Sequence, residues 1–167
     1  MEARLSQTEK ELVAVGASVA AGCVPCTQYH VKAVQAAGAT TEEIARAVDA
    51  ALCVKDSTKG IMRQVAREAL GLPAGDEPAC CANPADRLTE LVSIAAAVAV
   101  NCPTNFRRHV ETGRTVGVRD DEIQLAIGLA KMIRARATEK TDQAASELCS
   151  APAAAPAASC CGSSPCQ

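Results

Sequence analysis

The sequence is nearly without aromatic residues: it has no tryptophan, one tyrosine and one phenylalanine among 167 residues. Aromatic residues favour strands, and no segment alternates apolar and polar residues convincingly, as a half-buried strand does. Hydrophobic residues still make up 49% of the chain. The core must therefore consist of alanine, valine, leucine and isoleucine, which suit close-packed helices. We expect an all-α protein.

Two further features are missing: a long apolar run and an excess of charge of one sign. No apolar stretch approaches the roughly 20 residues that cross a bilayer, so we expect no membrane association. The start, Met1-Glu2-Ala3-Arg4, opens a polar segment and does not resemble a secretory signal, so we expect a cytoplasmic protein. The net charge of −2 gives no electrostatic basis for binding nucleic acid.

Cysteine, by contrast, is abundant, with ten residues. In a small secreted protein they would predict a disulfide framework. In a reducing compartment, clustered cysteines are more often catalytic or metal-binding. We adopt the second interpretation, because no secretory signal is seen.

The sequence repeats itself after a shift of 79 residues, the separation of Cys23 and Cys102. The shift pairs Glu11, Cys23, His30, Gly38 and Glu43 with Glu90, Cys102, His109, Gly117 and Glu122. An unbroken register with these residue types indicates a duplicated unit. We divide the chain into a first repeat (1–70), a linker (71–85), a second, degenerate repeat (86–149) and a disordered, cysteine-rich tail (150–167).

Each repeat is expected to form three helices. Ser6 and Glu9 form a capping-box pattern, and Gly22 is typical of a helix end. We expect Thr41 to cap the third helix, and Gly60 could interrupt it. In the second repeat, Asn101 takes the place of Gly22 and Asp120 that of Thr41.

The most informative motif is Cys23-x-x-Cys26-x-x-x-His30. On a helix these residues fall at i, i+3 and i+7, so two thiols and an imidazole share one stripe. Both cysteines would lie in the first turn, where the helix N-terminus favours thiolate. His30 could exchange a proton with Cys26, and Glu11 on the preceding helix could orient His30 or relay a proton.

Other interpretations of this motif stay open. Cys23, Cys26 and His30 could supply three zinc ligands, although no second C-x-x-C or H-x-H completes the set. They could also be buried core residues. Glu11 alone would be an ordinary solvated residue, but its recurrence as Glu90 favours a functional role.

A glutamate followed after twelve residues by C-x-x-C-x-x-x-H, on an alanine-rich helical unit, resembles the alkylhydroperoxidase D / carboxymuconolactone decarboxylase superfamily. The resemblance covers residues from about 5 to 70 and again from about 84 to 149. It implies an all-helical, homo-oligomeric enzyme that requires no cofactor. Such an enzyme reduces hydroperoxides with its dithiol and is regenerated by a dithiol donor of the lipoyl, thioredoxin or glutaredoxin type.

The same resemblance implies a role for each residue of the site. Cys26 would attack the peroxide, because it pairs with His30, and Cys23 would be the more accessible resolving thiol that meets the reductant. Glu11 and His30 would form the proton relay. One position departs from the pattern: the best-known redox members have a second histidine between the cysteines, where this sequence has Pro25.

The second repeat keeps Glu90, Cys102 and His109, but Asn105 stands where the first repeat has Cys26. This repeat cannot form the local disulfide. We interpret it as a structural, pseudosymmetric copy. Alternatively, it resembles the decarboxylase-like branch, in which proton transfer is the chemistry, or Cys102 acts as a lone thiol.

The remaining cysteines lie mostly outside the two repeats. As flexible thiols they suit soft ions of copper, mercury or arsenic, or they could carry reducing equivalents to the dithiol, or they are incidental. These outer cysteines are Cys80, Cys81, Cys160, Cys161 and Cys166. Cys53 and Cys149 are expected to be small apolar core residues.

The sequence therefore predicts a thiol-dependent oxidoreductase acting at Cys23 and Cys26, with a hydroperoxide or a disulfide as oxidant. Two alternatives remain: a soft-metal or metalloid binding protein, and a cofactor-free decarboxylase-like enzyme. We expect an oligomer, because the third helix of each repeat is long and apolar on more than one side.

Overall fold

The computed structural model describes residues 5–75 and 85–150, which form six α-helices and no strand. The helices are α1 (Gln7–Ala21), α2 (Val24–Ala36), α3 (Thr41–Ala69), α4 (Arg87–Ala99), α5 (Pro103–Thr115) and α6 (Asp120–Ser150). The all-α prediction is confirmed. None of these helices combines the length and the hydropathy that crossing a membrane requires.

The duplication is visible in the backbone. Helices α2 and α5 have 13 residues each, and both repeats place the second and third helices in the same register. Gly22 (φ 71°) and Asn101 (φ 55°) both adopt the left-handed conformation after the first helix of their repeat. Asparagine tolerates this conformation better than most residues, so Asn101 can replace the glycine.

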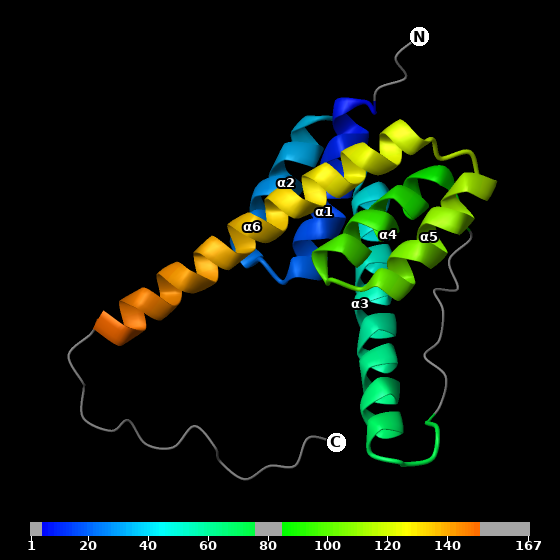
Figure 1. The fold of residues 1–167 in the computed structure, drawn as a ribbon. Helices are drawn as coiled ribbons and strands as arrows, with labels where there is room; N and C mark the ends of the chain where they lie inside the picture. The colour runs from blue at the N-terminus through cyan, green and yellow to red at the C-terminus, as the bar shows by residue number, and fades with distance from the viewer. Residues whose placement is uncertain (1–4, 76–84, 151–167) are drawn as a thin grey trace.

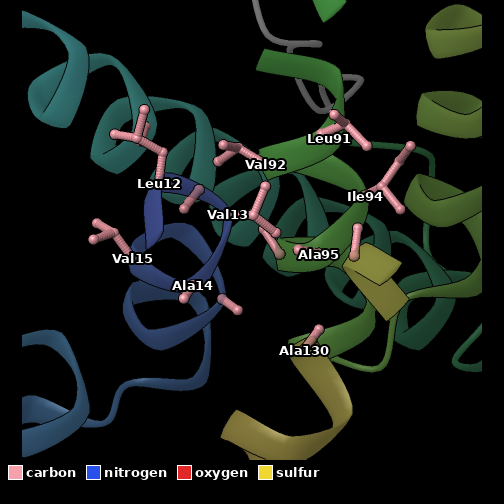
Figure 2. Packing of buried hydrophobic residues seen from close by; sticks show 14 of the residues in the cluster. Leu12, Val13, Ala14, Val15, Leu91, Val92, Ile94, Ala95 and Ala130 are labelled. Atoms are coloured by element: carbon pink, nitrogen blue, oxygen red, sulfur yellow. The ribbon is translucent and has the colours of Figure 1, made fainter. Parts of the chain in front are cut away.

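The core lies where α1 and α4, the first helices of the two repeats, pack against each other (Figure 1). Leu12 and Val13 of α1 face Val92 of α4, and Ala130 of α6 closes one side (Figure 2). A Cβ atom on Gly16 would come within 2.5 Å of the Val92 side chain. Glycine at this position therefore allows the close approach of the two helices.

Two details of the helix ends differ from the expectation. The cap of α3 is Thr40, whose side chain accepts a hydrogen bond from the Glu43 backbone N–H, and Thr41 is the first helical residue. Asp120 likewise lies in the first turn of α6. The capping-box spacing from Thr40 to Glu43 was the signal that distinguishes the two adjacent threonines.

Gly60 does not interrupt α3, which continues to Ala69. The cost of one glycine in a helix, about 1 kcal/mol, is small compared with the gain from strong helix formers on both sides of it. The distal half of α3 and the end of α6 both extend away from the α1–α4 core (Figure 1).

An ion-pair cluster around Arg87 joins the two repeats. Arg87 of α4 donates hydrogen bonds to Glu9 of α1 and to Glu122 of α6. Burial alone would raise the pKa of the Glu122 carboxyl, but the hydrogen bonds from Arg87 and from the Arg119 backbone outweigh it and hold the pKa below its ordinary value.

Candidate active site

The two cysteines of the C-x-x-C motif sit at the start of α2. Cys23 is the N-cap residue, and its Sγ accepts a hydrogen bond of 3.3 Å from the Cys26 backbone N–H. The expectation that both lie in the first turn is therefore wrong for Cys23, which precedes the helix. Pro25 fits the first turn because its missing N–H would have no helical partner there.

A disulfide joins Cys23 and Cys26, whose Cα atoms are 5.2 Å apart. The start of the helix holds both sulfur atoms together, one on the cap residue and one on the first turn. The structure thus shows the site in its oxidised form.

His30 and Glu11 form a pair beside the disulfide. His30 Nδ1 donates to Glu11 Oε2 over 2.8 Å, and Gln7 donates to the other carboxylate oxygen over 2.9 Å. Because an ionised carboxylate only accepts, His30 carries its proton on Nδ1, and Nε2 is the nitrogen available for chemistry. The sequence interpretation missed Gln7, although its position four residues before Glu11 on one helix was a usable signal.

A cleft of about 590 Å³ opens on this site and is lined by both repeats. The first repeat supplies Cys26, His30 and Glu11 among its lining. The opposite wall comes from α6, the last helix of the second repeat, through Leu129, Met132, Ile133, Arg136 and Lys140. No sequence motif pointed to this wall.

The accessibility of the two thiols is the reverse of the expectation. Cys26 lines the cleft, whereas Cys23 is only 6% exposed. The reason is the position of Cys23 at the junction between α1 and α2, where its backbone N–H bonds to Ser18 in the last turns of α1. The prediction that Cys23 is the more exposed thiol is wrong.

The second repeat reproduces the acid–imidazole pair but closes it off. His109 Nδ1 donates to Glu90 Oε2 over 2.8 Å, and both side chains are 7% exposed, compared with 16% for His30 and Glu11. Cys102 is a buried free thiol that caps α5 without a side-chain hydrogen bond.

Asn105, the counterpart of Cys26, attaches α5 to α3. It is 1% exposed, accepts a hydrogen bond from Ser57 and donates to Thr58 and to the Val54 carbonyl. Each repeat thus packs its third helix against its neighbour's site. The cleft of the first site reaches His30 and Glu11, whereas the pocket beside Cys102 reaches neither His109 nor Glu90.

The cysteines outside the two candidate sites differ from the expectation where the structure describes them. Cys149 is exposed, and Cys53 is partly buried and disulfide-bonded, so the prediction that both are apolar core residues is wrong. Within residues 5–75 and 85–150 no group of three or more histidine, cysteine or acidic residues could hold a metal ion. The cysteines assigned to soft ions lie outside the described residues: Cys80, Cys81, Cys160, Cys161 and Cys166.

Comparisons with known proteins agree with the duplicated architecture. No match was found among curated proteins or among solved structures. The model of the carboxymuconolactone decarboxylase family, however, matches residues 1–60 and 85–158. The two matched segments correspond to the two repeats, each with its glutamate, cysteine and histidine. The chain therefore belongs to the carboxymuconolactone decarboxylase family.

Proposed function

We propose that this protein is a thiol-dependent oxidoreductase that reduces an organic hydroperoxide with the Cys23–Cys26 dithiol. The observation that supports this most directly is the joint placement of a C-x-x-C disulfide and a His30–Glu11 pair on one open cleft. The second repeat has a more deeply buried acid–imidazole pair and no second thiol at its site.

The first step is the activation of Cys26. In the reduced protein its thiol lies in the first turn of α2, where the helix N-terminus favours thiolate. His30 follows one turn later and has Nε2 free to take the thiol proton, while Glu11 stabilises the resulting imidazolium. The carboxylate thus acts as the positioning group of an activated nucleophile.

The reduction of the hydroperoxide then needs no cofactor. The Cys26 thiolate attacks the terminal oxygen of the hydroperoxide, the O–O bond breaks, and the alkoxide leaves as an alcohol after accepting the proton from His30. Cys26 becomes a sulfenic acid, which the Cys23 thiol attacks with loss of water. The product is the disulfide seen in the structure.

Regeneration requires an external dithiol of the lipoyl, thioredoxin or glutaredoxin type. Because Cys26 lines the cleft and Cys23 is buried, the donor thiolate attacks the Cys26 sulfur and Cys23 leaves as the first free thiol. The second donor thiol then releases Cys26. This order of attack replaces the one that the family resemblance implied.

The test is peptide-level thiol titration. The reduced protein is treated with cumene hydroperoxide, and mass spectrometry follows the peptide that contains Cys23 and Cys26. Wild type should form the disulfide rapidly, Cys26→Ser should not, and Cys102→Ser should behave like wild type. Equal thiol loss in wild type and Cys26→Ser would contradict the proposal.

A decarboxylase-like activity is the second candidate, because the glutamate–histidine pair occurs in both repeats and needs no thiol for proton transfer. A variant with both Cys23→Ser and Cys26→Ser separates the two functions. Decarboxylase-like turnover that survives in this variant would support proton-transfer chemistry, and loss of that turnover would count against that chemistry.

A further inference from the structure

We infer that the hydroperoxide reduced at Cys26 is an amphipathic anion, with an apolar body and a carboxylate or similar negative group, as in a fatty-acid hydroperoxide. This inference rests on the proposed function and adds the class of substrate. Three observations support it: the charges around the cleft, its exposed apolar wall, and the comparison with the second repeat.

The cleft carries an excess of positive charge. Lys10, Arg136 and Lys140 line it, and the only acidic residue in its lining, Glu11, is occupied by His30 and Gln7. Within the described part of the chain, the Lys10 ammonium group has no hydrogen-bond or ion-pair partner, and that of Lys140 meets only the side chain of Gln143, at 3.4 Å.

Arg136 is the third cation, and it is paired with Glu139 over 2.8 Å. Both side chains of this pair are largely exposed, at 70% and 61%, so the pair contributes little stability and can open for a ligand. A cleft lined by one sign of charge concentrates ligands of the opposite sign. The charge of this cleft therefore favours an anion.

Apolar side chains of the same cleft are unusually exposed. Met132 is 54% exposed and Tyr29 is 67% exposed, and both line the cleft together with the half-buried Leu129 and the buried Ile133. Ligand sites are typically clefts of about 300–1,000 Å³ with apolar walls and a few placed polar groups. An acyl chain lying on this wall would bring its hydroperoxide toward Cys26 and its carboxylate toward the cations.

The second repeat serves as an internal control for these residues. The 79-residue shift places Thr89 opposite Lys10, Ser57 opposite Arg136 and Ile61 opposite Lys140. All three counterparts are neutral. The helical scaffold therefore does not itself require cations at these three positions, and the two cations beside Cys102, Lys131 and Arg134, stand at other positions of α6.

The negative group takes no part in the reaction. Two protein thiols and one hydroperoxide give a disulfide, an alcohol and water, and the carboxylate of the substrate leaves unchanged. The carboxylate contributes only to binding of the substrate. Its effect should therefore appear in the rate of disulfide formation at low substrate concentration, and this effect should weaken as salt screens the cations.

The test is a single-turnover measurement of disulfide formation in the reduced protein, without any reductant present. The probes are linoleic acid hydroperoxide, its methyl ester and cumene hydroperoxide. We expect the acid to react about tenfold faster than the ester, a ratio that corresponds to a modest electrostatic contribution. The double variant Lys10→Gln/Lys140→Gln should remove this preference by lowering the rate with the acid to the rate with the ester.

Lys32→Gln is the matched control, because Lys32 is an exposed lysine of α2 outside the cleft lining. Equal rates with acid and ester in wild type would overturn the inference and leave the proposed function intact. The inference would also be overturned if the double variant kept the preference for the acid and slowed only the reduction of the disulfide by a dithiol, since the cations would then serve the reductant. If none of the three hydroperoxides oxidises the dithiol, the proposed function itself fails.

Discussion

Replacing Asn105 by cysteine should restore a disulfide in the second repeat. The backbone at the two helix starts is already alike: Cys23 has φ −87° and ψ 95°, and Cys102 has φ −105° and ψ 95°. Both precede a helix that begins one residue later, so a cysteine at position 105 would face Cys102 as Cys26 faces Cys23. We expect Cys102 to form a disulfide with the introduced cysteine under oxidising conditions.

The same substitution should cost stability in the reduced protein. Asn105 makes three hydrogen bonds to α3, with Ser57, Thr58 and the Val54 carbonyl. At about 1 kcal/mol for each bond, the free energy of unfolding should fall by about 3 kcal/mol. A disulfide that closes so short a loop returns about 2 kcal/mol in the chain-entropy account, so the oxidised variant should remain only slightly less stable than wild type.

Urea unfolding followed by circular dichroism, with and without reductant, measures both effects. Asn105→Ala is the matched control, because it loses the same hydrogen bonds and cannot form the new disulfide. Wild type and this control also show how reduction of the native disulfides, those of Cys23–Cys26 and of Cys53, affects stability. The reasoning is refuted if reduced Asn105→Cys is as stable as wild type, or if mass spectrometry finds no disulfide between Cys102 and the introduced cysteine after oxidation.

Two further predictions concern the paired carboxylates. Glu11→Gln should slow disulfide formation by hydroperoxide by about tenfold to a hundredfold, because an amide does not stabilise the His30 imidazolium. The free energy of unfolding should change little. Glu90→Gln is the control and should leave the rate unchanged. Arg87→Met should lower the free energy of unfolding at pH 7 by about 2 kcal/mol, because Glu122 is a buried carboxylate that loses a partner. Arg87 holds the pKa of Glu122 below its ordinary 4.5. The stabilisation of the folded protein by the Arg87–Glu122 pair is therefore complete above about pH 4.5 and is lost as the pH falls through the lowered pKa. The difference between wild type and Arg87→Met in urea unfolding should therefore shrink below pH 4.5, and a difference that grows instead would contradict this assignment.

The pairing of residues in the candidate site could be predicted from sequence because their relations are local or repeated. Helix periodicity placed His30 one turn after Cys26, and the recurrence of Glu11 as Glu90 pointed to a partner on the preceding helix. The structure shows both pairs at the same 2.8 Å separation. The fold class followed from the scarcity of aromatic residues and from the apolar periodicity.

What could not be predicted depends on contacts between distant segments. The burial of Cys23 results from the turn that links α1 and α2, and the cleft wall results from α6 crossing the first repeat. Neither leaves a signature near the motif. The continuous α3 shows a different limit, because Gly60 is a weak local signal that the surrounding helix formers override.

The exchange of third helices between the repeats gives the second repeat a part in the candidate site of the first. Its α6 forms one wall of the open cleft and carries two of the three cations that line it, Arg136 and Lys140. In its own site, the bonds from Asn105 to α3 join that repeat to the first one. A cysteine at position 105 would give up these bonds for a disulfide in a site where neither Glu90 nor His109 lines the pocket beside Cys102. The absence of a second thiol in one copy thus fits a structural role, in which α6 of the second repeat forms a wall of the cleft at the first.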